Sequence, residues 1–219
     1  MLLGCLVVPK VTVQSALVPA AYFIERPSHR VCPVHMSAPA QNDGATQGDG
    51  HAAGKKFKDL TLVFCRRQLA QGPKEVLLGM KKRGFGAGKW NGFGGKVEPG
   101  ETVEQAASRE LLEESCVKAN GLLRRGRLIF TVPSYPHVMR VHVFEADGYT
   151  GTPQETEEML PRWYEEQSLP FQDMWADDPF WLPLFLAGKM FEGEFDFKDD
   201  DTIHTHTLRE VAKLQAEDA

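Results

Sequence analysis

The sequence predicts an α/β protein of the α+β type, in which a mixed β-sheet is sandwiched between helices. Apolar, β-rich segments occur both before and after a helical segment at residues 102–115, and a second helical segment lies at 178–187. Strands on both sides of the main helix favour a mixed sheet covered by helices. The 42% hydrophobic and 25% charged residues are ordinary for a globular protein, which excludes a largely disordered chain.

The strands are predicted from apolar runs separated by turn residues. Segments 60–66 and 75–81 flank a polar turn with Gly72 and Pro73 and predict a hairpin. The other expected strands are 122–132, 138–149, 162–165 and 191–197, with 202–208 pairing with the last of these.

Both helices carry recognisable end signals. Thr102 and Gln105 have the spacing of a capping box, so the first helix begins at residue 102 and continues to about Ser115. Asp178 before Pro179 predicts a cap residue followed by a proline in the first turn. The second helix is expected to end at a glycine, Gly188.

The chain divides into an extension at 1–59, a domain at 60–212 and a short tail at 213–219. The first 35 residues contain three Lys or Arg and one acid, which weakly resembles a mitochondrial presequence. A passive tail, or a start at Met36, is the alternative, and residues 37–58 have a linker composition. We expect a cytoplasmic protein, with nuclear and mitochondrial fractions as further locations.

Charge and cysteine content limit the partners. A net charge of −5 disfavours polymeric nucleic acid as a ligand, and an acidic protein that handles phosphates needs a metal to screen repulsion. No apolar run reaches the ~18 residues of a membrane span. The four cysteines form no CxxC pair, so we expect reduced thiols. We expect a monomer.

Residues 84–100 are unusually rich in glycine, with seven glycines among 17 residues. Such a loop brings backbone N–H groups close to a ligand, and the helix that follows adds its dipole. Together these features are suited to binding phosphate.

The helix that follows places Glu110, Glu113 and Glu114 on the side that also carries small apolar residues. Like charges at this spacing repel each other, and partial burial adds a desolvation cost. A solvated acidic face is one explanation; clustered hard oxygen ligands for Mg²⁺ or Mn²⁺ are the other. The glycine-rich loop favours the metal. Arg109 points to another side, where it can pair with Glu101.

Seven residues have fixed spacing over 20 positions, in the order Gly95, Glu101, Arg109, Glu110, Leu111, Glu113 and Glu114. This pattern resembles the Nudix box of the Nudix hydrolases. Segments 79–97, 173–178, 201–203 and 207–211 further resemble members of that family that act on oxidised purine nucleoside triphosphates.

The resemblance implies a Nudix fold and Mg²⁺-dependent hydrolysis of a nucleoside triphosphate to the monophosphate and pyrophosphate, with Mn²⁺ as a substitute. Its substrates would be 8-oxo-dGTP, 2-hydroxy-dATP and methylated purine triphosphates, so that the enzyme would sanitise the nucleotide pool. The implied metal ligands are Gly94 through its carbonyl, Glu110, Glu113, Glu114 and Glu158. Glu110, Glu114 and Glu158 are the implied catalytic residues. Whether Glu114 or Glu158 activates the attacking water stays open.

The same resemblance implies a substrate pocket that binds the base and the phosphates. It comprises Thr61, Lys81, Phe85, Asn91, Phe93, Gly94, Gly95, Lys96, Phe130, Met139, Met159, Trp175, Ala176, Asp177 and Asp178. Trp175 would stack on the purine. Two adjacent carboxylates do not easily both ionise, so one aspartate pKa is expected to rise.

One position departs from the family pattern, because Cys116 stands where the Nudix box has glycine. That glycine normally ends the helix in a left-handed turn. Two other functions stay open: a Nudix hydrolase for another substrate, such as ADP-ribose, a dinucleotide or an RNA cap, and a catalytically silent nucleotide-binding module.

Overall fold

The computed structural model describes residues 56–215. The predictions for the targeting segment, the start at Met36 and most of the linker at 37–58 lie outside the described residues, as do Cys5 and Cys32. The end of the predicted linker and extension is wrong, because residues 57–59 belong to the first strand, Phe57–Gln68. Cys65 is a free thiol buried in the core. In the described part of the chain, no helix is long and apolar enough to cross a membrane.

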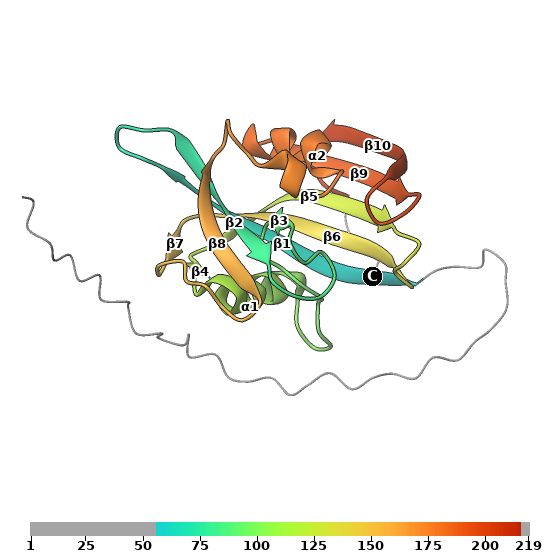
Figure 1. Cartoon of the computed structure of the whole chain (residues 1–219), viewed down its shortest axis with the longest axis horizontal. Helices are drawn as coiled ribbons and strands as arrows, with labels where there is room; N and C mark the ends of the chain where they lie inside the picture. Colours follow the sequence, from blue (N-terminus) through green and yellow to red (C-terminus); the bar gives the residue numbers. More distant parts are fainter. Residues whose placement is uncertain (1–55, 216–219) are drawn as a thin grey trace, which may run out of the picture. The chain divides into compact units, whose positions relative to one another are not determined.

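The described chain folds into ten strands, two α-helices and one 3₁₀ helix (Figure 1). The strands are β1 (Phe57–Gln68), β2 (Lys74–Lys81), β3 (Trp90–Asn91), β4 (Lys118–Ala119), β5 (Leu122–Thr131), β6 (Val138–Ala146), β7 (Tyr149–Thr150), β8 (Met159–Glu165), β9 (Met190–Phe197) and β10 (Ile203–Val211). The helices are α1 (Val103–Ser115), the 3₁₀ turn η1 (Phe171–Asp173) and α2 (Asp178–Leu186). The predicted strand at 138–149 is divided into β6 and β7.

Eight strands form one mixed sheet in the order β10-β9-β5-β6-β1-β2-β3, with β8 also paired to β2. The predicted hairpin is β1–β2, which pairs Cys65 with Leu77, and β9 and β10 pair antiparallel as expected. Two contacts are parallel: β1 pairs with β6, and β5 pairs with β9. The predicted mixed sheet is confirmed.

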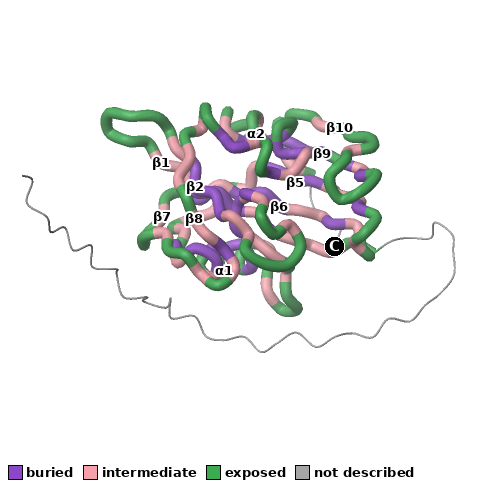
Figure 2. The backbone as a smooth tube through the Cα atoms, in the orientation of Figure 1, coloured by how far each residue is buried: buried purple, intermediate pink, exposed green. Residues whose placement is uncertain are grey.

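The sheet separates two hydrophobic cores, which confirms the sandwich. Neighbouring residues Val63 and Phe64 of β1 belong to different cores because side chains alternate between the faces of a strand. Phe64 packs with Trp181 and Phe185 of α2, whereas Val63 shares a core with Leu111 of α1. Figure 2 shows buried segments in the sheet and in both helices.

Helix α1 begins as predicted. The Thr102 hydroxyl accepts the Gln105 N–H at 3.2 Å, and the Gln105 side chain accepts the Thr102 N–H at 2.7 Å, which completes the capping box. At the other end Cys116 adopts the left-handed conformation, with φ 59° and ψ 21°. Among the described residues it is the only non-glycine residue with positive φ. Replacement of the glycine by cysteine has therefore preserved the turn.

Helix α2 differs from the prediction at its start. Asp178 is the first helical residue, and Asp177, which precedes the helix, makes no capping bond with its side chain. The Asp178 carboxylate instead accepts the backbone N–H of Trp175 at 2.9 Å, so it orders the segment before the helix. At the C-terminal end Gly188 has φ 72°, as expected for a terminating glycine.

Candidate active site

A cavity of about 600 Å³ opens between the glycine-rich loop, strands β1, β5 and β6, and the segment that leads into α2. Most residues of the predicted pocket line it, together with Glu158, which was predicted as a metal ligand. They are Thr61, Lys81, Phe85, Asn91, Gly94, Gly95, Lys96, Phe130, Met139, Glu158, Met159, Trp175, Asp177 and Asp178. The topology therefore brings together residues separated by more than 100 positions in the sequence.

Phe93 and Ala176 do not line the cavity, which corrects the prediction for both. Phe93 is fully buried in the core that contains Leu111 of α1. It alternates with Gly92 and Gly94, so its side chain points away from the cavity that Gly92 and Gly94 line. Ala176 packs at the edge of the other core, between Trp175 and Asp177.

The absence of side chains at two positions lets the glycine-rich loop approach β1 and α1. A Cβ atom on Gly94 would lie 2.0 Å from the Thr61 carbonyl oxygen, and one on Gly95 would lie 2.5 Å from Oε1 of Glu110. Neither position can accept a side chain without displacing its neighbours. The loop therefore reaches the carboxylate face of α1 as a bare backbone.

Glu114 is the most buried carboxylate of α1, with 3% of its surface exposed. Its Oε2 accepts the Gly94 N–H at 2.9 Å, and its Oε1 lies 3.7 Å from Nζ of Lys81. Burial raises the pKa of Glu114 to about 7, against the opposing effect of the Lys81 charge and the Gly94 hydrogen bond. A buried carboxylate with this pKa is typical of a functional site.

Arg109 corrects the prediction that it points away from the carboxylate cluster. It bonds Glu101 at 2.7 Å, as expected, but Nη1 also lies 2.8 Å from Glu110 and 3.2 Å from Glu113. The long side chain bends back across the helix surface, because three acids attract one guanidinium. Burial nevertheless raises the pKa of Glu110, whereas the Arg109 hydrogen bond lowers the pKa of Glu101.

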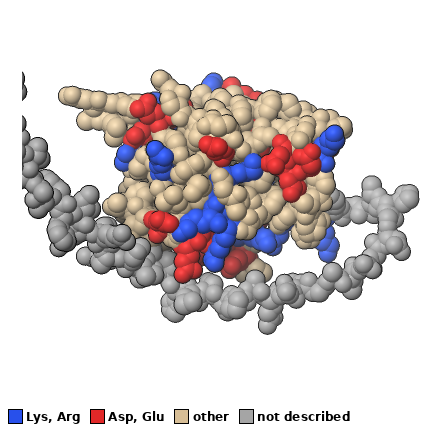
Figure 3. Space-filling model, viewed as in Figure 1, with Lys and Arg blue, Asp and Glu red and all other residues tan. Residues whose placement is uncertain are grey.

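Glu158 reaches the site from the loop before β8 and is partly exposed. Its Oε1 lies 2.6 Å from Nη2 of Arg83, across the mouth of the cavity. Figure 3 shows Lys and Arg side chains gathered near the middle of this face, with acidic side chains beside them. Each predicted acidic ligand thus has a basic neighbour.

The residues on this face fit a divalent cation. Among residues 56–215, no three acidic, histidine or cysteine side chains are close enough to form a metal cage as they stand. Each carboxylate is paired with a basic side chain. Glu114 lies next to Lys81, Glu158 next to Arg83 and Glu110 next to Arg109. The donor set is nevertheless hard oxygen, and a bound cation would offset the burial that raises the pKa of Glu110 and Glu114.

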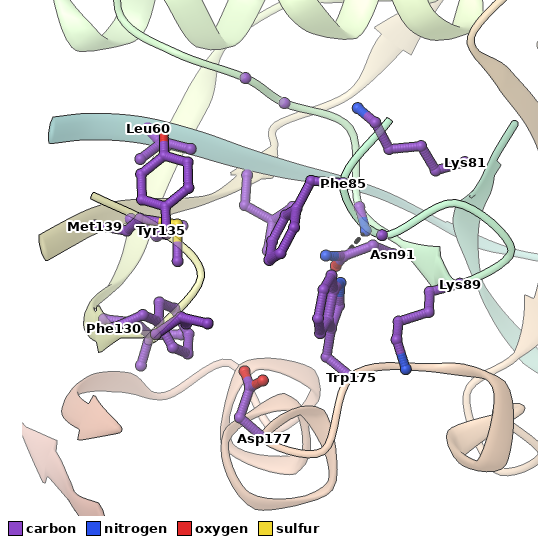
Figure 4. A pocket seen from close by; sticks show the side chains of 18 of the residues that line it. Leu60, Lys81, Phe85, Lys89, Asn91, Phe130, Tyr135, Met139, Trp175 and Asp177 are labelled. Atoms are coloured by element: carbon purple, nitrogen blue, oxygen red, sulfur yellow. Dashed lines mark hydrogen bonds between the residues drawn. The ribbon is translucent and has the colours of Figure 1, made fainter. Parts of the chain in front are cut away.

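The opposite end of the cavity contains two buried acids. Oδ2 of Asp177 accepts the indole N–H of Trp181 at 2.8 Å, and Asp178 accepts the Trp175 N–H. Burial raises the pKa of both aspartates, and the Asp177 charge raises that of Asp178 further. The expected rise in an aspartate pKa is confirmed. Figure 4 shows Asp177 at one side of the cavity, below Trp175.

The predicted purine platform is already in contact with another ring. Phe85 stacks on Trp175, with 5.0 Å between the ring centroids and 30° between the planes. At this distance the rings touch, so a base cannot lie between them. A purine that uses this face of Trp175 must first displace Phe85, which is 47% exposed. Gly84 and Gly86, which flank Phe85, both have positive φ, a conformation that glycine adopts without strain.

Sequence reasoning missed several residues that line the cavity. They include Leu60, Leu62, Arg83, Lys89, Val132, Tyr135, Trp181, Phe197 and Asp200. Lys89 lies within the glycine-rich run at 84–100, and a basic residue in a loop suited to phosphate was an available signal. Tyr135 sits in the proline-containing turn between β5 and β6, where no local pattern indicates that the side chain turns inward.

Comparison with known protein families finds a family that matches this chain. The NUDIX domain matches residues 62–185, more than half of the chain and all of the carboxylate helix. The chain belongs to the NUDIX family. The family and the fold predicted from the Nudix box are confirmed. Members generally use divalent metal ions, in agreement with the hard oxygen donors of α1.

Two curated Nudix relatives are similar over most of their length. Both are named oxidized purine nucleoside triphosphate hydrolase. The one from Mus musculus is 55% identical over 139 residues, which cover 64% of this chain and 89% of the relative. The one from Danio rerio is 53% identical over 157 residues, which cover 72% of this chain and 97% of the relative.

A solved Nudix-type structure supports the architecture. The mutator MutT protein from Bacillus halodurans superposes with a TM-score of 0.58 at 20% identity. The match covers 69% of this chain and 97% of that protein. At this identity the likeness shows the fold alone.

Proposed function

We propose that this Nudix protein hydrolyses oxidised purine nucleoside triphosphates to the monophosphate and pyrophosphate, and thereby sanitises the nucleotide pool. The observation that carries the proposal is that the buried pair Asp177 and Asp178 lines the same cavity as Gly94 and Glu158, two of the implied metal ligands. Buried carboxyl groups of raised pKa can read the polar edge of a base. The names of both curated relatives agree with this substrate.

At the end of the cavity where the triphosphate would bind, the proposed role of the protein is to hold a metal ion. Glu110, Glu113, Glu114 and Glu158, with the Gly94 carbonyl, would hold the metal, for which we propose Mg²⁺. When bound, the ion screens the triphosphate charge and lowers the pKa of a coordinated water.

Two lysines and the Gly94 N–H also contribute to the proposed triphosphate site. Lys81 and Lys96 line the cavity there and offer positive charge to the phosphates. Gly94 keeps the Glu114 carboxylate in place through its N–H, which leaves Oε1 facing Lys81. Glu114 and Glu158 are the two candidates to take a proton from the attacking water.

At the end of the cavity where the base would bind, we propose that the protonation of Asp177 and Asp178 determines which bases are accepted. A protonated aspartate donates a hydrogen bond, and an ionised one only accepts. Asp177 and Asp178 share a buried site in which burial opposes ionisation of both. Exchange of one proton within this pair would let the same cavity receive 8-oxoguanine and 2-hydroxyadenine, which present different donors and acceptors.

Pyrophosphate release tests the proposal. The protein is supplied with 8-oxo-dGTP, 2-hydroxy-dATP, dGTP or ADP-ribose at equal concentration, with and without Mg²⁺, and Glu114→Gln is the blank. We expect metal-dependent turnover concentrated on the two oxidised nucleotides. Turnover mainly on ADP-ribose would retain the metal site and overturn the base assignment. Nucleotide binding without turnover would indicate a silent binding module.

We also propose that the protein acts as a monomer in the cytoplasm. Light scattering of the purified protein tests the monomer. Imaging of the full chain, beside a form that starts at Met36, tests the location and any mitochondrial fraction.

A further inference from the structure

Lys89 forms contacts at the cavity that the proposed chemistry does not use. Its Nζ lies 2.8 Å from Oδ1 of Asp201, in the turn between β9 and β10. The same atom lies 5.0 Å from the centre of the Trp175 ring and 3.5 Å from the Met174 carbonyl oxygen. One ammonium group thus joins the glycine-rich loop, the β9–β10 turn and the segment that carries the purine platform.

The backbone of Lys89 is fixed while its side chain spans the gap. The Lys81 N–H donates to the Lys89 carbonyl oxygen at 3.0 Å, and the Lys89 N–H donates to the Gly86 carbonyl oxygen at 3.1 Å. A Cβ on Gly86 would lie 2.7 Å from the Trp175 ring, so the loop backbone lies directly against the indole. Figure 4 shows Lys89 and Phe130 on opposite sides of Trp175. Lys89 therefore supports the ring from the side away from Phe130.

We propose that Lys89 is a positioning residue for the purine platform: paired with Asp201, it holds Trp175 and the backbone of the glycine-rich loop in place, so that only the Phe85 side chain has to move when the base binds. This inference rests on the proposed function of the cavity. The loop carries three glycines with positive φ, Gly84, Gly86 and Gly88, and without the pair it would sample many conformations. Binding would then have to order the loop, at a cost in affinity.

The position of Lys89 separates this role from catalysis. Its ammonium group faces Asp201 and the indole, whereas the carboxylate helix meets Lys81 and Arg109. Loss of Lys89 should therefore change how tightly a nucleotide binds, but not how fast the bound nucleotide is hydrolysed. An exposed ion pair contributes modestly, so we expect a roughly fivefold effect on binding.

Binding of 8-oxo-dGMP, measured by calorimetry without metal, tests the role directly. We expect Lys89→Met to weaken binding roughly fivefold, and Asp201→Asn to reproduce most of that loss. The double variant should be no weaker than Lys89→Met, because both changes break one contact. Lys89→Arg should restore binding. With 8-oxo-dGTP and Mg²⁺, KM should rise in Lys89→Met while kcat stays within about twofold.

Lys189→Met is the matched control. Lys189 forms an ion pair of the same kind with Glu210, at 2.9 Å, and does not line the cavity. It should bind 8-oxo-dGMP like the unaltered protein. Unchanged binding by Lys89→Met, additive losses in the double variant or a large fall in kcat would each overturn the positioning role.

The same measurements distinguish this inference from the proposed function. If the unaltered protein neither binds 8-oxo-dGMP nor hydrolyses 8-oxo-dGTP, both fail. If the unaltered protein does both and Lys89→Met behaves identically, only the positioning role fails. Thermal unfolding of each variant checks that the fold is intact, since a lowered midpoint with normal binding also counts against the role.

Discussion

The Gly94 N–H donates a hydrogen bond to Oε2 of Glu114 at 2.9 Å, and this bond ties the glycine-rich loop to helix α1. Glu114 is thereby buried, close to Lys81 and next to the other carboxylates of the helix. The site keeps a carboxylate that destabilises the folded protein when ionised. Its presence at the junction of loop and helix is explained by function rather than by stability.

Replacement of Glu114 by glutamine should stabilise the folded protein at alkaline pH. The folded-state pKa is raised from 4.5 to about 7, so the carboxylate costs nothing below pH 4.5 and its full penalty above about pH 7. The variant should gain about 3 kcal/mol in unfolding free energy at pH 8 and nothing at pH 4. Urea unfolding across this range measures it, with the exposed Glu104→Gln as control. A gain independent of pH would contradict the argument.

Asp177→Asn should change the choice of base. The amide cannot ionise, so the buried pair can no longer exchange a proton between its members. We expect the ratio of kcat/KM for 8-oxo-dGTP to kcat/KM for 2-hydroxy-dATP to differ from that of the unaltered protein by about tenfold or more at some pH between 5 and 8. Steady-state kinetics over that range provide the measurement, and Asp173→Asn, at an exposed acid nearby, is the control. Equal loss on both nucleotides at every pH would reject proton exchange as the basis of selection.

Cys116→Gly should stabilise the protein by about 1 kcal/mol. The left-handed backbone at residue 116 strains any residue with a Cβ atom, and glycine removes that strain. Thermal and urea unfolding should both show the gain. Cys116→Ala separates strain from the thiol: it keeps the Cβ atom and should show no such gain. Equal stabilisation by alanine would attribute the effect to the cysteine sulfur.

Arg109→Met should destabilise the protein, by about 1–3 kcal/mol at low ionic strength. The change leaves Glu101, Glu110 and Glu113 without the guanidinium that bonds all three. Arg109→Lys keeps the charge but loses the forked geometry, so it should recover only part of the loss. Urea unfolding of the three proteins at two salt concentrations measures the effect. Full recovery by lysine would show that charge alone matters.

Local signals predicted the local elements. The capping box located the start of α1, the Gly72-Pro73 turn located the β1–β2 hairpin, and Gly188 located the end of α2. Each signal acts within a few residues, so the sequence displays it. The pairing of β1 with β6, and of β5 with β9, has no such signal. Alternation indicates which face of a strand is buried but not which strand lies beside it.

The residues of the site were predictable where the family pattern specifies them. The contacts of a side chain were less predictable where it can reach several partners. The pattern placed Asp177, Asp178 and Trp175 correctly at one cavity. It could not show that Arg109 turns toward Glu110, because a long side chain reaches several faces of a helix. The direction of the Phe93 side chain depends on the alternation of a short irregular segment. The contact between Phe85 and Trp175 joins two loops that are 90 positions apart, and no local pattern indicates it.

The parallel contact between β1 and β6 has a kinetic consequence. Asp59 and Arg140 meet across these strands although 81 positions separate them. The centre of the sheet can form only after that long loop has closed, and contacts so distant in sequence slow folding. During synthesis β1 must wait, unpaired on this edge, until β6 has left the ribosome. Chains truncated before β6 should consequently expose an apolar strand and aggregate.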